Sequence, residues 1–196
     1  MELRRKQVNL KGGKVAYLSA YNLGKGDITV IFAKDKNKRK VAECHFSYVY
    51  VFERALSEKE RILNARYGKI PIEKIPKVKE FKLDEFSTQS FKVSGNEIVL
   101  ATGDRYKVKR KYLNLIGISI LEREFYKVGL GTEMIKEVEK FAIKMGCDSI
   151  QGIYLPNGEF QFGAHDFYRR NGFEFYKDLG VNCIRKKITK ISSLTI

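Results

Sequence analysis

Residues 112–145 read YLNLIGISILEREFYKVGLGTEMIKEVEKFAIKM, and this stretch decides the fold. It begins with a run of leucine and isoleucine that is interrupted by Gly117 and Ser119. Such a run is typical of a central strand covered on both faces, although a buried helix shows the same local pattern. Because a glycine-bearing loop follows at once, the run favours a strand over 113–121.

An amphipathic helix is predicted directly after the loop, over 131–145. Counted from Met134, apolar residues recur at positions i, i+4, i+7, i+8 and i+11, which form one stripe of an α-helix. Glutamate and lysine occupy the other side of that helix. Gly146 stands where a left-handed residue would end it.

The loop between the predicted strand and helix contains Gly129 and Gly131. A helix start has unpaired N–H groups and a partial positive charge, so it attracts phosphate. A residue without a Cβ also lets an anionic group approach the backbone closely. An ordinary strand-to-helix turn that uses glycine for its geometry is the alternative. The strand before and the helix after favour an anion site.

This loop resembles the acyl-CoA pyrophosphate loop of the GNAT superfamily of N-acetyltransferases. The family pattern is Arg/Gln-x-x-Gly-x-Gly/Ala, and the matching residues are Tyr126, Lys127, Val128, Gly129, Leu130, Gly131 and Thr132. Tyr126 stands where the family usually has Arg or Gln. A second family signature, Ala-x-x-Phe/Leu-Tyr-x-x-x-Gly-Phe, is similar to residues 164–173, which include Phe167 and Tyr168.

The resemblance covers about residues 109–190 and implies an α/β (α+β) fold with a mixed, mostly antiparallel central sheet. A β-loop-α-β unit would bind the acyl-CoA. We expect a single domain over 1–196, in which 109–190 is the cofactor-binding core. Residues 1–108 would be a divergent, β-rich part with an irregular arm over about 69–91.

The resemblance also implies that acetyl-CoA is the cofactor and that an amine, on a small molecule or a protein, accepts the acetyl group. The pantetheine arm would lie in an opening between strands 113–121 and 149–155, paired with the backbone of Ser119, Ile120 and Leu121. The pyrophosphate would rest on the amides of Val128 to Thr132. Phe167 and Asn157 would line the cofactor, Asn157 being near the asparagine that the family often places after its fifth strand.

Tyr168 matches the family tyrosine that protonates the leaving thiolate, and a phenol with a pKa near ~10 is suited to that role. A core tyrosine with no catalytic role is the alternative. The base that deprotonates the amine is left unassigned. Glu122 and Glu124 are the nearest carboxylates in sequence, and a water chain would serve equally well.

Other segments show clear local signals. Strands are predicted over 15–18, 28–32, 41–52, 98–101, 149–155, 173–176 and 181–188, and a second amphipathic helix over 160–171. Ser57 and Glu60 form a capping box for a short helix over 57–66. Pro71 and Pro76 interrupt the arm over 69–91, which fits a flexible arm, a substrate lid or an inserted edge strand.

The composition supplies a second hypothesis. The chain has 38 basic and 23 acidic residues, a net charge of +15. Such an excess attracts nucleic acid, so a nucleic-acid-binding protein is the alternative function, with ribonucleoprotein contact through 34–40, 105–111 and 185–190. A catalytically inactive binding module with the GNAT fold is a further alternative function.

Cys44, Cys147 and Cys183 lack metal-ligand spacing and fit reduced thiols. With no apolar run long enough for a bilayer and no secretory signal, we expect a cytoplasmic protein.

Overall fold

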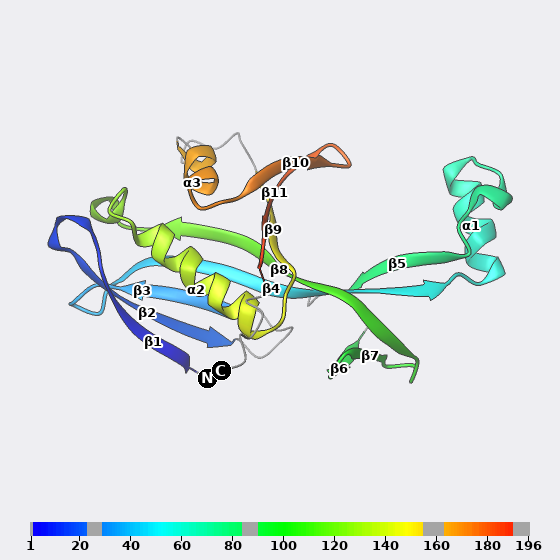
Figure 1. The fold of residues 1–196 in the computed structure, drawn as a ribbon, viewed down its shortest axis with the longest axis horizontal. Coiled ribbons are helices and arrows are strands. Elements are labelled where there is room, and N and C mark those ends of the chain that lie inside the picture. The colour runs from blue at the N-terminus through cyan, green and yellow to red at the C-terminus, as the bar shows by residue number, and fades with distance from the viewer. Residues whose placement is uncertain (1, 23–28, 84–89, 155–162, 190–196) are drawn as a thin grey trace. The chain divides into compact units, whose positions relative to one another are not determined.

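The computed structural model describes residues 2–22, 29–83, 90–154 and 163–189 (Figure 1). The contacts along the chain divide it into two compact units. Unit 1 consists of Met1–Tyr48 and Tyr112–Ile196, and unit 2 consists of Val49–Lys111. Two 16-residue strands, β4 (Lys40–Ala55) and β8 (Arg105–Ile120), contribute residues to both units.

Unit 1 is built on a sheet with the strand order β1-β2-β3-β4-β8-β9-β11-β10. Its remaining strands are β1 (Glu2–Asn9), β2 (Val15–Asn22), β3 (Thr29–Lys34), β9 (Ser149–Ile153), β10 (Glu174–Asp178) and β11 (Val181–Lys187). The pairs β1–β2, β2–β3, β3–β4, β9–β11 and β10–β11 are antiparallel, whereas β8 and β9 are parallel. This is the predicted mixed, mostly antiparallel sheet with a β-loop-α-β unit.

Helix α2 (Leu130–Lys144) covers one face of this sheet (Figure 1). Met134, Ile135, Val138 and Ala142 are buried, and the Phe141 ring lies 5.5 Å from that of Phe46 on β4. Burial of this apolar stripe stabilises the helix more than its intrinsic propensity does. The predicted helix and its end are confirmed, since Gly146 has a φ of 67°.

The C-terminal part also follows the prediction. Strand β9 comes after α2, helix α3 (Ala164–Arg170) comes next, and β10 and β11 form a hairpin. The first residues of the helix predicted over 160–171 lie outside the described residues, and α3 accounts for 164–170.

Unit 2 contains α1 (Glu58–Gly68), β5 (Val78–Leu83), β6 (Phe91–Ser94) and β7 (Glu97–Leu100). The predicted capping box is confirmed, because Ser57 accepts from the Glu60 amide and Glu60 from the Ser57 amide. Strand β5 pairs with the far half of β4, so the inserted edge strand is the alternative that the structure supports for the arm. The Phe52 ring packs between Phe81 and Tyr106, at 5.8 and 4.9 Å.

Three expectations need correction. Strand β1 was not predicted. Strand β8 begins at Arg105 rather than at 113, because the basic cluster over 105–111 pairs with β7 and its cations lie beside Glu97 and Glu53. The apolar run is also not covered on both faces along its whole length. Leu113 and Leu115 are buried, but Ile116 is 45% exposed.

The three cysteines are free and buried, as their scattered spacing indicates. None of the helices in the described part of the chain has the length and apolar character that a membrane span requires.

Candidate functional site

Strands β8 and β9 part near the middle of β8. Their pairing runs from Tyr112 opposite Ser149 to Asn114 opposite Gln151 and ends there, although β8 continues to Ile120. Beyond this point apolar side chains are open to solvent, since Leu121 is 46% and Ile153 64% exposed. Among the described residues, nothing pairs with the end of β8 on the side of β9, and exposed apolar groups lie beside it. This is the setting that β-augmentation uses.

The start of α2 follows the loop after this strand end. Gly129 is the N-cap, with a φ of 98° that favours glycine. The first helical hydrogen bond runs from the Glu133 amide to the Gly129 carbonyl. No described group accepts from the amides of the three residues between them, 130–132, and no side chain caps the helix. Such amides can donate to a diphosphate.

The chain holds the loop that precedes α2 in place from several sides. Phe125, in the 3-10 turn Arg123–Phe125, is buried. The Val128 carbonyl accepts from the Lys11 amide at 3.0 Å, and the Leu121 amide donates to the Val41 carbonyl at 2.8 Å. These backbone contacts preorganise the loop next to the open strand edge.

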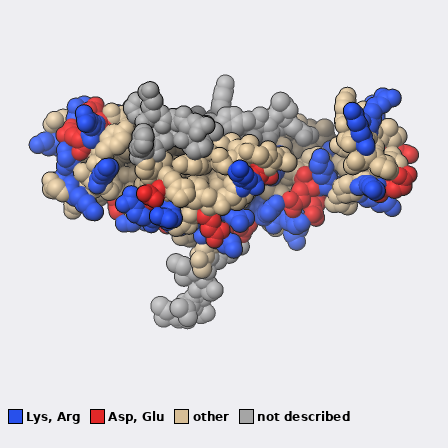
Figure 2. All heavy atoms as spheres, turned by 90° about the horizontal axis from the view of Figure 1, so that it is seen from above, with Lys and Arg blue, Asp and Glu red and all other residues tan. Residues whose placement is uncertain are grey.

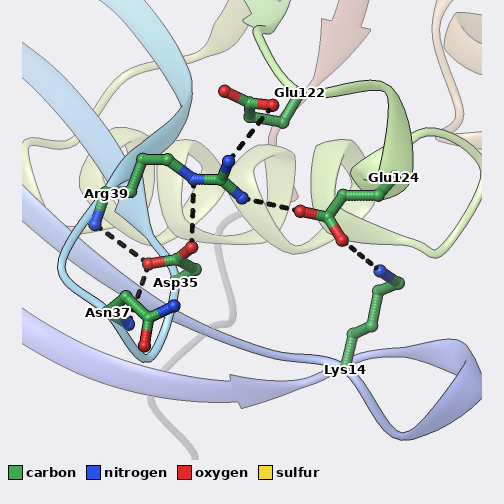
Figure 3. A network of polar contacts seen from close by, with 6 residues as sticks. All are labelled: Lys14, Asp35, Asn37, Arg39, Glu122 and Glu124. Carbon is green, nitrogen blue, oxygen red and sulfur yellow. Dashed lines mark hydrogen bonds and ion pairs between the residues drawn. The ribbon is translucent and has the colours of Figure 1, made fainter.

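An ion-pair network fastens the same loop to two turns of unit 1 (Figure 3). Arg39, in the β3–β4 turn, donates to Glu124 at 2.7 Å and lies 3.6 Å from Glu122. Glu124 also accepts from Lys14 at 2.9 Å. Asp35 accepts from the Arg39 side chain and amide, which fixes the turn that carries the guanidinium.

This network bears on the two candidate bases. The hydrogen bond from Lys14, and then that from Arg39, lower the pKa of Glu124. A carboxylate that already accepts from two cations and has a lowered pKa is a weak general base. Glu122 faces the same guanidinium. The geometry thus gives both side chains a role in holding the loop.

Tyr126 turns back onto the strand that precedes the loop. Its hydroxyl donates to the Ile120 carbonyl at 3.1 Å, while its side chain stays 44% exposed. The neighbouring Lys127 has a φ of 58°, a conformation that non-glycine residues seldom adopt. The residue that replaces the family's Arg or Gln is therefore engaged with the protein's own backbone.

Gly131 and Phe167 are in contact between the two helices. A Cβ built on Gly131 would lie 3.0 Å from Phe167 Cε2 and 3.1 Å from Cζ. Glycine at this position lets the Phe167 ring of α3 approach the first turn of α2. The two matched signatures, far apart in the sequence, thus meet in space.

Tyr168 lies in a cluster of aromatic rings. Its ring is 5.1 Å from Phe167, 5.4 Å from Phe173 and 6.4 Å from Tyr154. Burial, with smaller contributions from Cys44 and Tyr154, raises the pKa of Tyr168 to about 12. The phenol therefore keeps its proton throughout the neutral range, as an acid must before it donates.

The structure places these predicted residues on neighbouring elements of unit 1. Ser119 and Ile120 end β8, Leu121 follows it, the loop 126–129 leads into α2, and Phe167 and Tyr168 lie on α3. Asn157 lies outside the described residues. Lys11, Lys14 and Arg39 support the loop but were not predicted, because their partners are distant in sequence and no local pattern marks them.

Carboxylates accompany many cations of the predicted basic clusters. Arg39 contacts three acids, Lys109 contacts Glu53 and Glu80, and Lys186 donates to Glu139. Figure 2 shows the same interleaving of basic and acidic side chains on the face in view. Among the described residues, no group of three or more His, Cys, Asp or Glu side chains is placed to hold a metal ion.

The chain is similar in fold to solved structures, and the first of the three that follow supports the assignment of this architecture. The chain is similar to the GNAT domain of S. lividans PAT, with 8% identity, a TM-score of 0.52, and coverage of 93% of this chain and 96% of that one. A GNAT-family acetyltransferase of Staphylococcus aureus has 11% identity and a TM-score of 0.46, and the match covers 86% of this chain and 72% of that one. A GNAT-family acetyltransferase of Listeria monocytogenes has 15% identity and a TM-score of 0.40. The match covers 81% of this chain and 63% of that one, so the chain spans less than two thirds of that protein. No protein-family model matches the sequence, and no curated protein does either.

Proposed function

We propose that this chain, which has the fold of the GNAT acyl-CoA N-acyltransferases, is an acetyl-CoA-dependent N-acetyltransferase that acts on an amine. The observation that carries the proposal is the parting of β8 and β9 after Asn114 and Gln151 beside the uncapped start of α2. A strand edge and a row of amides, both without a partner among the described residues, suit the two chemically different halves of coenzyme A. In this proposal the chain works as one domain, with 109–190 as its cofactor-binding core.

The amides at the start of α2 would bind the diphosphate. A Cβ built on Gly129 would meet no described atom within 4 Å, and the first helical hydrogen bond is the one that the Glu133 amide donates. Main-chain donors fixed in this way need no rearrangement to receive an anion. The edge of β8 after Asn114 would hold the pantetheine amides as an added strand, and Ile116 and Leu121 would contact its apolar parts.

Tyr168 would supply the proton of the reaction. When bound, acetyl-CoA contributes an acetyl thioester, whose C–S bond breaks as the C–N bond to the amine forms. Tyr168 would then protonate the leaving sulfur, since its half-buried phenol carries a proton throughout the neutral range. The amine loses a proton before attack, and this is assigned to water because Glu122 and Glu124 face Arg39 and Lys14.

A thermal-shift titration tests the cofactor. A ligand that binds only the folded state raises the melting temperature, so CoA should stabilise the wild type, and the effect should persist in moderate salt. Retention on nucleic acid that fails as salt rises, with no effect of CoA, would support the alternative function instead.

Tyr168→Phe tests the catalytic role. The variant should bind CoA as the wild type does but transfer acetyl groups about 10²-fold more slowly or worse, since a positioned acid contributes on that order. Tyr67→Phe, at a residue 82% exposed on α1, is the matched control and should leave the rate unchanged. A wild-type rate in Tyr168→Phe would remove Tyr168 from the mechanism.

A further inference from the structure

We propose that Tyr126 gates the cofactor edge of β8. Its hydroxyl donates a hydrogen bond to the Ile120 carbonyl, and the pantetheine arm of CoA must displace the hydroxyl to bond with that oxygen. This inference rests on the proposed function and deepens it, because it assigns a role to the position at which the chain departs from the family's loop.

The direction of the Ile120 carbonyl follows from one peptide group. The Leu121 amide donates to the Val41 carbonyl of β4. In a trans peptide the N–H and the preceding C=O point in opposite directions. The Ile120 oxygen therefore points away from β4, toward the side of β8 on which β9 pairs nearer the start of the strand.

This oxygen would be an acceptor for the added strand. Pairing with β9 ends at Asn114 and Gln151, so no described strand bonds to β8 at Ile120 on that side. An extended ligand laid along the edge would donate its amide N–H groups to carbonyls that point there. The Tyr126 hydroxyl already donates to this one, at 3.1 Å.

The side chain that makes this contact can leave it. Tyr126 is 44% exposed and follows the turn Arg123–Phe125, with no other hydrogen bond of its side chain to the described residues. A phenol released from the carbonyl would be hydrated, so its departure costs only the net value of one hydrogen bond. Tyr126 thus covers the Ile120 carbonyl through a single hydrogen bond.

Removal of the hydroxyl should therefore improve binding of the arm. Tyr126→Phe should bind CoA about 2- to 10-fold more tightly than the wild type, the range that the net value of one neutral hydrogen bond allows. ADP, which has a diphosphate but no pantetheine arm, should bind both proteins equally. Tyr67→Phe is the control and should match the wild type with both ligands.

Calorimetric titration of the three proteins with each of the two ligands, CoA and ADP, separates the outcomes. Equal or weaker CoA binding by Tyr126→Phe would overturn the gate, because the hydroxyl would then be neutral or would contact the ligand. An equal increase in affinity for CoA and for ADP would also overturn the gate, since the effect of the substitution would then lie at the diphosphate. If the wild type and both variants fail to bind CoA, the proposed function itself falls, and this inference falls with it.

Discussion

Gly131 matters for its lack of a side chain rather than for an unusual backbone. A Cβ there would meet the Phe167 ring at 3.0 Å. Gly131→Val should push that ring aside, distort the amides of the first turn of α2, and lower CoA affinity about tenfold or more. Calorimetry against CoA measures this effect, and unchanged affinity would refute the loop assignment. Tyr67→Phe, at an exposed residue of α1, should keep both affinity and melting temperature.

The phenol of Tyr168 should titrate unusually late. Burial raises its pKa from 10 to about 12 in the folded protein. The folded state thus favours the neutral phenol, so the stability that this group contributes is complete below pH 10 and declines as the pH rises toward 12. In an ultraviolet titration, the wild type should show one more phenol ionising near pH 12 than Tyr168→Phe does. If the phenol missing from Tyr168→Phe instead ionises near pH 10, the ordinary pKa of tyrosine, burial does not raise the pKa of Tyr168.

The junction of β8 and β9 depends on Gly152. A Cβ at this residue would lie 2.7 Å from the Leu115 carbonyl oxygen, a backbone atom that cannot rotate away. Gly152→Ala should therefore destabilise the fold, by about 1–3 kcal/mol. Denaturant unfolding measures the change, with Gly117→Ala as the control on the same sheet. A stability equal to wild type would mean that the two strands are free to separate further.

The Arg39 network should stabilise the loop between β8 and α2 in a pH-dependent manner. Lys14 and Arg39 lower the pKa of Glu124 from 4.5. Stability from Glu124 is thus present above pH 4.5 and is lost as the pH falls through the lower, folded value. Arg39→Met should lower the melting temperature at neutral pH, and the difference from wild type should shrink in acid and in high salt. A constant difference would point to packing instead.

Unit 2 consists of the second part of β4, the first part of β8 and the elements between them. Strands β4 and β8 run in opposite directions, since Val41 meets Leu121 at one end while Glu53 meets Lys109 at the other. Replacement of residues 50–110 by a two-residue turn should leave unit 1 folded and able to bind CoA. Loss of CoA binding by a folded variant would assign cofactor contacts to unit 2. If acceptor use changes instead, unit 2 belongs to the acceptor site.

The sequence was most informative where local patterns carry the structure. The helical stripe from Met134, the left-handed Gly146, the Ser57–Glu60 capping box and the order of elements after residue 112 all depend on short-range geometry. The extent of β8 was less readable, because lysines at 105–111 enter a strand only when carboxylates of neighbouring strands pair with them. Strand β1 was missed for a similar reason, since its polar residues are held by pairing with β2.

By itself, the sequence determined a strand, a glycine loop and an amphipathic helix, in the order in which the structure has them. The hydrophobic period and the turn residues are local properties, and they can be read without knowledge of their partners. Only the tertiary structure decided that β8 and β9 part after Asn114, that Phe167 packs on Gly131, and that Tyr126 closes on Ile120. These features depend on which distant side chains meet, and a contact between remote residues leaves no mark on either segment alone.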